Sequence, residues 1–236
     1  MPVCILELSH AANIISQTTV FIKYQSSTFI YMLVHHIILA MLWIVYCILH
    51  SAMASVSLKK KLKLKLGSSF KYYRLFYSVL AFLLLAGVLY YQISIPTYKL
   101  LPGTLPVLLP GIIFTVSGLS LMMICIKKYF VSLSGLLSVF EENPSNTLII
   151  NGVHRFIRHP LYSGTFVFIW GLFLLFPFVS LLIADTIITV YTLIGIGFEE
   201  NKLIAEFGES YVAYKKQVPK LIPSFKPKEF RKHSHR

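Results

Sequence analysis

The stretch of the sequence richest in potential chemistry is NGVHRFIRHPLYSG, residues 151–164. It holds two histidines, two arginines and a proline immediately before a hydrophobic segment. A chain that only enters a bilayer does not need this combination. A second polar feature, the pair Glu199 and Glu200, follows a later hydrophobic segment. If the fold brings the two features together, carboxylates would face imidazole and guanidinium groups and form a polar pocket.

The elements that would position these residues are strongly hydrophobic. Of the 236 residues, 56% are hydrophobic and only 13% are charged, whereas a soluble domain usually has about a quarter charged residues. The predicted solvent is therefore a lipid bilayer. The net charge of +13 comes from basic residues between the hydrophobic segments, which favours anionic lipid headgroups over nucleic acid as a partner. Three cysteines without a zinc-type spacing predict neither a disulfide framework nor a metal site.

Five hydrophobic segments predict an all-α, polytopic membrane protein with five transmembrane helices in a single domain, residues 1–236. A helix crosses the hydrocarbon core with about 20 residues, and the segments lack the alternation expected of barrel strands. They cover residues 29–49, 75–95, 105–126, 161–176 and 178–198. Only Pro177 separates the last two segments, which predicts a helical hairpin.

The distribution of charge predicts the orientation of these spans. With five spans, 20 of the 22 lysines and arginines fall on one side of the membrane, and only Lys23 and Lys99 fall on the other. The positive-inside rule then places the C-terminus in the cytosol. Residues 199–218 carry apolar side chains at three- and four-residue spacing, which predicts an amphipathic helix on the cytosolic surface. Residues 219–236 are expected to form a basic tail.

The predicted hairpin has a consequence for the polar residues. Its first helix leaves the cytosolic side and its second returns there, so His159 and Tyr162 should lie at the same membrane level as the glutamate pair, 199–200. A simpler interpretation also fits the pattern. Arg158 and His159 could be interfacial anchors beside a solvated helix end, with Pro160 as an ordinary first helical residue.

Three motifs in fixed order carry a family resemblance: RHPLYSG at residues 158–164, EE at 199–200 and FGESYVAYKKQVPKLIP at 207–223. Together they resemble the isoprenylcysteine carboxyl methyltransferase and phospholipid methyltransferase superfamily, whose members are membrane enzymes that use S-adenosylmethionine. The resemblance implies a pocket for this cofactor and no metal. The residues it assigns to the cofactor are Asn146, Thr147, Leu148, Ile149, His154, Arg158, His159, Pro160, Leu161, Tyr162, Glu199 and Glu200.

The chemistry of the cofactor agrees with these residue types. Its sulfonium and ammonium groups suit aromatic faces and a carboxylate such as that of Glu199. Its carboxylate needs donors such as Arg158 or His159. Methyl transfer is an in-line displacement, so positioning and desolvation should dominate catalysis.

Three positions depart from the family pattern. His154 stands where the family commonly has a tyrosine, and Asn146 stands where it has a histidine. Gly195 stands where isoprenylcysteine enzymes place an arginine that holds the substrate carboxylate. This last departure disfavours a prenylcysteine carboxylate as the acceptor.

The first half of the sequence carries a second resemblance. HSAMAS at residues 50–55 and KYYRLFY at residues 71–77 resemble the NnrU-like proteins and the bacterial methanethiol S-methyltransferases. The resemblance places His50 and Arg74, the predicted catalytic residues, at the cytosolic ends of the first two spans. A thiol has an ordinary pKa of about 8.5, so His50 could accept its proton. The alternative is an interfacial histidine that caps a span.

The sequence thus predicts an S-adenosylmethionine-dependent integral membrane methyltransferase with a cytosolic active site, and a bacterial inner membrane is favoured. The expected acceptor is small or lipophilic, with a thiol ahead of a prenylcysteine carboxylate or a phospholipid amine. Two alternatives stay open. One is an NADPH-dependent sterol-type reductase, although adjacent glutamates would repel the phosphates of NADPH. The other is a non-enzymatic NnrU-like ligand-binding membrane protein. Asp185, the only acid inside a predicted span, is expected to make a structural hydrogen bond.

Overall fold

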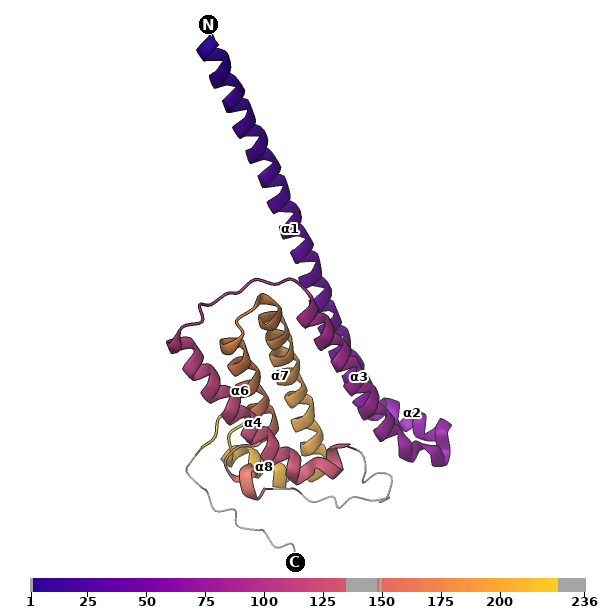
Figure 1. The fold of residues 1–236 in the computed structure, drawn as a ribbon. Coiled ribbons are helices and arrows are strands. Elements are labelled where there is room, and N and C mark those ends of the chain that lie inside the picture. The colour runs from indigo at the N-terminus through magenta and orange to yellow at the C-terminus, as the bar shows by residue number, and fades with distance from the viewer. Residues whose placement is uncertain (1, 135–147, 149, 225–236) are drawn as a thin grey trace, which may run out of the picture.

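A computed structural model describes residues 2–134, 148 and 150–224, and these residues are almost entirely helical (Figure 1). The all-α prediction is confirmed for this part of the chain, where the only β-type pairing is an isolated bridge between Lys99 and Phe178. The helices are α1 (Pro2–Ala54), α2 (Val56–Leu66), α3 (Tyr73–Ser94), α4 (Leu105–Ser134), α6 (Pro160–Leu175), α7 (Val179–Phe207) and α8 (Glu209–Gln217), with short 3-10 helices at Gly67–Tyr72 and Gly152–Arg155.

Four helical segments in the described part of the chain are long and apolar enough to cross a membrane, which indicates an integral membrane protein. They are Ser27–Ala54, Ser57–Ser94, Leu105–Lys127 and Val179–Phe207. Helix α6 is apolar but has only 16 residues. At about 1.5 Å per residue it is shorter than the hydrocarbon core. A fifth span at this helix therefore stays a prediction.

Helices α4 and α6 pack against each other at very short range, and glycines make this possible. A Cβ atom added to Gly118 would collide with the backbone nitrogen of Phe168, and one added to Gly171 would lie 2.5 Å from the backbone nitrogen of Thr115. Small residues at such contacts allow two helix backbones to approach closely within a membrane. The start of α6, which carries the RHPLYSG motif, is therefore fixed against α4.

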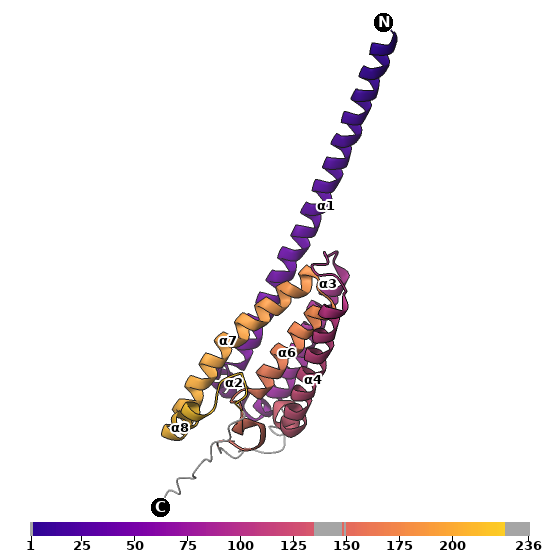
Figure 2. The same ribbon diagram turned by 90° about the vertical axis from the view of Figure 1, so that its left-hand side faces the viewer.

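Helices α1, α3 and α7 form the second packing unit (Figure 2). Its buried centre consists of Leu39, Trp43, Val88, Ile95 and Ala184. The Trp43 indole donates a hydrogen bond of 2.9 Å to the amide oxygen of Gln92. The carboxylate oxygen Oδ2 of buried Asp185 has no hydrogen-bond partner among the described residues, so the expected structural hydrogen bond is not seen at this oxygen.

Residues 176–178 connect α6 to α7, and Pro177 lies in this connection as the sequence predicts. The backbone nitrogen of Leu100 donates to the Pro177 carbonyl at 2.6 Å, and that of Val179 donates to the Tyr98 carbonyl at 3.0 Å. These bonds hold the connection against the segment that follows α3. The interpretation of α6 and α7 as a transmembrane hairpin stays a prediction, as does the single-domain assignment.

The predicted amphipathic helix at 199–218 is wrong in its start and its continuity, whereas its place at the cytosolic surface stays a prediction. Helix α7 runs without interruption to Phe207, and the break comes at Gly208, whose φ of 54° favours glycine. The separate helix α8 then buries Tyr211, Tyr214 and Val218 against protein rather than lipid. The reason is that nothing at residue 199 ends a helix, whereas Gly208 does. Of the predicted basic tail, residues 225–236 lie outside the described residues.

Candidate functional site

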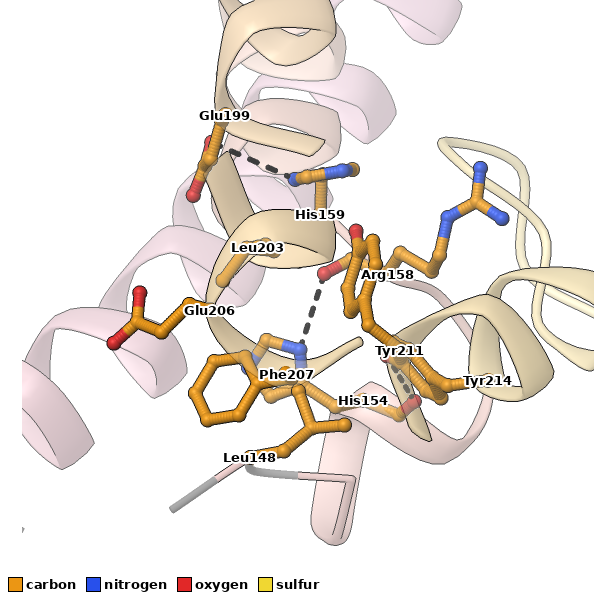
Figure 3. Close-up of a pocket in the computed structure, with 10 residues that line it drawn as sticks. All are labelled: Leu148, His154, Arg158, His159, Glu199, Leu203, Glu206, Phe207, Tyr211 and Tyr214. Carbon is orange, nitrogen blue, oxygen red and sulfur yellow. Dashed lines mark hydrogen bonds and ion pairs between the residues drawn. The ribbon is translucent and has the colours of Figure 1, made fainter. Parts of the chain in front are cut away.

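The start of α6, the end of α7 and helix α8 meet at one end of the bundle and enclose a pocket of about 310 Å³ (Figure 3). The prediction that residues near 159 and 199 lie together is therefore confirmed, because His159 and Glu199 both line this pocket. The residues that line the pocket are Leu148, His154, Arg158, His159, Glu199, Leu203, Glu206, Phe207, Tyr211 and Tyr214.

A network of ion pairs lies behind this pocket and is centred on Glu200. Its side chain is only 3% exposed, and its Oε1 atom lies 2.9 Å from Nη2 of Arg158. Its Oε2 atom lies 2.9 Å from Nζ of Lys215. A buried carboxylate is stable only when paired in this way. Because Glu200 is not among the residues that line the pocket, its predicted contact with the cofactor stays a prediction, and its observed partners are protein cations.

Arg158 fixes the motif to the chain that follows α8. Its Nη1 atom donates to the carbonyl oxygens of Lys215 at 2.6 Å and Val218 at 3.0 Å. Its backbone nitrogen donates to the Pro219 carbonyl at 2.9 Å, and that of His159 donates to the Lys220 carbonyl at 3.2 Å. The start of the predicted tail thus runs along the RHP motif and holds it in place.

His159 is buried between the two glutamates. Its Nε2 atom lies 3.3 Å from Oε1 of Glu200, and its Nδ1 atom lies 3.8 Å from Oε2 of Glu199. Burial lowers the pKa of His159 below its ordinary value, and the two carboxylates only partly oppose this shift. The imidazole is therefore neutral near pH 7, and the tautomer with a proton on Nε2 donates to Glu200.

Glu199 faces the pocket and differs from its neighbour in its surroundings. Its side chain is 43% exposed. Its Oε2 atom is buried and has no hydrogen-bond partner within the described residues. Tyr162 lies beside it, within electrostatic reach of this carboxylate, and its ring stacks on His159 with the centroids 5.7 Å apart. We call Arg158, His159, Glu199, Glu200 and Lys215 the charged cluster.

Of the other predicted cofactor residues, some line the pocket, some do not, and some lie outside the described residues. Leu148 and His154 line the pocket. The His154 ring lies 3.1 Å from the Arg158 carbonyl oxygen, and the Tyr214 hydroxyl donates to the His154 carbonyl at 2.8 Å. Pro160 and Leu161 form the first turn of α6 and are not among the lining residues. The predicted residues Asn146, Thr147 and Ile149 lie outside the described residues.

Five lining residues were not predicted as site residues. They are Leu203, Glu206, Phe207, Tyr211 and Tyr214. Four of them follow the three- and four-residue spacing that predicts an amphipathic helix, and this spacing does not reveal that their apolar face lines a pocket. The break at Gly208 turns α8 back over the end of α7 and makes this face a pocket wall.

The predicted catalytic residue His50 lies in a second group of polar side chains from α1, α3 and α7. The Tyr77 hydroxyl lies 3.0 Å from the imidazole nitrogens of His50. The hydroxyls of Ser51 and Tyr191 lie 2.9 Å apart, and the rings of Tyr46 and Tyr191 lie 6.0 Å and 6.5 Å from the His50 ring. We call Tyr46, His50, Ser51, Tyr77 and Tyr191 the aromatic cluster.

Arg74, the other predicted catalytic residue, lies in the first turn of α3, three residues before Tyr77. Its carbonyl oxygen accepts a hydrogen bond of 3.0 Å from Ser78. Neither Arg74 nor His50 lines the pocket. Tyr162 connects the two regions, because it lies beside Glu199 and also within electrostatic reach of Tyr77 and Tyr191.

Comparisons with known proteins agree with the motif resemblance. Residues 107–210 match the phospholipid methyltransferase family. A methanethiol S-methyltransferase of Crocosphaera subtropica is 36% identical over 88 residues, which are 36% of this chain and 33% of the relative. A protein-S-isoprenylcysteine O-methyltransferase of Schizosaccharomyces pombe is 36% identical over 84 residues, 35% of this chain and 36% of the relative.

Each of these matches spans about a third of the relative's length. No solved structure matches the chain significantly. The expected resemblance to methanethiol S-methyltransferases is confirmed, whereas the NnrU-like part of it stays a prediction. Residues 107–210 are therefore similar to the superfamily of membrane methyltransferases that includes the phospholipid and isoprenylcysteine enzymes.

Proposed function

We propose that the protein is an S-adenosylmethionine-dependent membrane methyltransferase that acts on a small or lipophilic thiol. The observation that carries this proposal is the Glu199 carboxylate, which faces a pocket at the RHPLYSG motif and has an Oε2 atom without a partner among the described residues. A partly exposed carboxylate beside aromatic rings suits a cationic ligand.

The residues of the pocket fit the cofactor in three respects. Glu199 would offer an acceptor for its ammonium group, and the aromatic lining residues Phe207 and Tyr211 would suit its sulfonium. Arg158 keeps its Nε atom buried without a partner in the described residues, so this donor remains for an anionic group. The cofactor supplies an activated methyl group, and the charged cluster binds and orients it.

On the acceptor side, His50 would take the proton of the thiol, while the methyl group passes from the sulfonium of the cofactor to the thiol sulfur and the demethylated cofactor leaves as a neutral thioether. A neutral imidazole is suited to accept a proton near neutral pH. Arg74 lies in the first turn of α3, and its positive charge would stabilise the thiolate form of the acceptor. A prenylcysteine carboxylate or a phospholipid amine is the next acceptor class. We place the active site at the cytosolic face, with a bacterial inner membrane favoured and residues 1–236 as one domain.

Calorimetry of the purified full-length protein in detergent tests the proposal. Titration with S-adenosylmethionine should release or absorb heat with one-site stoichiometry, and titration with NADPH should not. Binding of NADPH alone would instead support a sterol-type reductase. Absence of both signals would support a non-enzymatic ligand-binding protein and overturn the proposal.

A further inference from the structure

We propose that the methyl acceptor binds against the aromatic cluster, that it is a small uncharged alkyl thiol, and that Tyr77 and Tyr191 position His50 toward it. This inference rests on the proposed function and adds the place and chemical class of the acceptor. The cluster is contributed by three helices that are far apart in the sequence, α1, α3 and α7.

The hydrogen bonds of the cluster orient its reactive group. Tyr77 holds the His50 imidazole at 3.0 Å, and its ring centroid lies 5.4 Å from that of the imidazole. Tyr191 meets the imidazole edge-on, with an interplanar angle of 82°, and Ser51 holds the Tyr191 hydroxyl. Two phenol rings therefore fix the plane of the imidazole from two different helices.

The chemistry of the cluster selects against charged acceptors. Its side chains are phenols, an imidazole and a hydroxyl, and no carboxylate or ammonium belongs to it. The titratable groups that face it are Cys47 beside Tyr46 and Tyr191, Tyr73 and Arg74 beside Tyr77, and Tyr162. Aromatic rings contribute apolar contact area, which suits an alkyl chain. A neutral thiol with a short alkyl group matches both the rings and the base.

One residue, Tyr162, interacts with both the charged cluster and the aromatic cluster. Tyr162 stacks on His159 of the charged cluster and lies within electrostatic reach of Tyr77 and Tyr191. The members of the aromatic cluster other than Ser51 are half-buried, so their rings remain partly accessible. We therefore expect the thiol and the methyl donor to meet on the side of the aromatic cluster that faces Tyr162.

Kinetics of the Tyr77→Phe variant test the positioning role. With methanethiol as acceptor, kcat should fall about five- to tenfold, and the pH dependence of kcat/KM should change because the imidazole has lost its partner. The affinity for S-adenosylmethionine should stay within twofold of that of the unaltered protein. Tyr90→Phe, at a tyrosine that is 71% exposed on the same helix, is the matched control and should change neither quantity.

A second variant tests the acceptor class by a gain of function. Tyr191→Ala should enlarge the acceptor site and shift the preference between butanethiol and methanethiol, measured in direct competition, by about tenfold toward butanethiol. An unchanged preference in Tyr191→Ala, together with an unchanged pH profile in Tyr77→Phe, would overturn the inference. S-adenosylmethionine binding is measured separately. If the unaltered protein does not bind S-adenosylmethionine, the proposed function is overturned instead.

Discussion

The charged cluster and the aromatic cluster both interact with Tyr162, yet they satisfy their polar groups in opposite ways. In the charged cluster, buried Glu200 is paired with Arg158 and Lys215 at 2.9 Å each. In the aromatic cluster, hydroxyl and imidazole groups pair with one another at 2.9–3.0 Å and carry no formal charge.

This difference between an ion-paired cluster and a neutral cluster indicates how one membrane protein could bind two unlike molecules at adjacent sites. A network with one carboxylate paired to cations and one that faces the pocket suits a ligand with separated charges, because the ion pairs of Glu200 stabilise the network while Glu199 stays partly exposed. A neutral aromatic site suits an apolar molecule that arrives from the lipid. Variants that disturb only one cluster should therefore have effects confined to one ligand.

The largest expected effect follows from neutralising the centre of the charged cluster. Glu200→Gln would leave Arg158 and Lys215 without their carboxylate, and removal of one partner from a buried ion pair typically destabilises a protein by about 3–5 kcal/mol. Urea unfolding in detergent should show this loss. Glu206→Gln, at an exposed position, is the control and should stay within about 0.5 kcal/mol. A Glu200→Gln variant as stable as the control would show that the network is not structural.

Neutralising the open carboxylate should affect binding rather than folding. Glu199→Gln should weaken S-adenosylmethionine binding by about 10- to 100-fold, because it removes a charge-assisted contact with a cation. Its midpoint of unfolding should stay close to that of the unaltered protein, since Glu199 is 43% exposed. Calorimetry of Glu199→Gln beside Glu209→Gln, an acid in the first turn of α8, makes the comparison. Equal affinities in the two variants would contradict the role of Glu199.

The pH dependence of stability should identify the buried histidine of the charged cluster. Burial lowers the pKa of His159, so below about pH 6.5 the unfolded chain takes up a proton before the folded protein does. Its contribution to stability is therefore complete above that pH and is lost as the pH falls, by at most about 1.4 kcal/mol per pH unit. As the pH falls from 7.5 to 5, the unfolding free energy of the unaltered protein should therefore fall relative to that of His159→Asn. A difference between the two proteins that does not vary with pH would contradict the lowered pKa of His159.

The smallest expected effect separates two tyrosines of α8. The Tyr214 hydroxyl donates to the His154 carbonyl, so Tyr214→Phe should lower the unfolding free energy by about 1 kcal/mol. The Tyr211 hydroxyl is buried without a partner in the described residues, and burial raises its pKa to about 12, so it is a neutral group. Tyr211→Phe should cost nothing or should stabilise the protein. Thermal unfolding of the two variants side by side checks the order, and the reverse order would contradict these contacts.

The sequence was sufficient to predict the meeting of His159, Tyr162 and Glu199. Hydrophobic segments of readable length fix the helices, and the short connection at Pro177 returns the second helix to the level where the first began. The motifs then lie together for topological reasons that do not depend on details of packing. The same topology explains why residues 40 positions apart can be predicted to lie together.

The pocket walls could not be predicted in the same way. The turn at Gly208 depends on a positive φ angle that the pattern of apolar residues does not reveal, and without it Tyr211 and Tyr214 lie on a lipid-facing surface. The different roles of Glu199 and Glu200 also depend on the direction of each side chain. Adjacent residues on a helix point about 100° apart, so only one of them could face the pocket.

The partners of His50 were missed for a different reason. Tyr77 is the last residue of the KYYRLFY motif at residues 71–77, but Tyr191 lies in the middle of a hydrophobic segment, where a tyrosine is an ordinary residue. It joins the aromatic cluster because α7 packs against α1. Contacts between helices that are distant in the sequence have no signature in the spacing of residues along one helix.

The most direct test of the account is methyl transfer itself. The purified protein, supplied with S-adenosylmethionine labelled in the methyl group and with methanethiol, should produce labelled dimethyl sulfide. His50→Gln should slow this transfer at saturating cofactor, while cofactor affinity stays unchanged. Label transfer that proceeds equally fast in the His50→Gln variant, or no transfer to any thiol despite tight cofactor binding, would contradict the assignment of the two clusters to donor and acceptor.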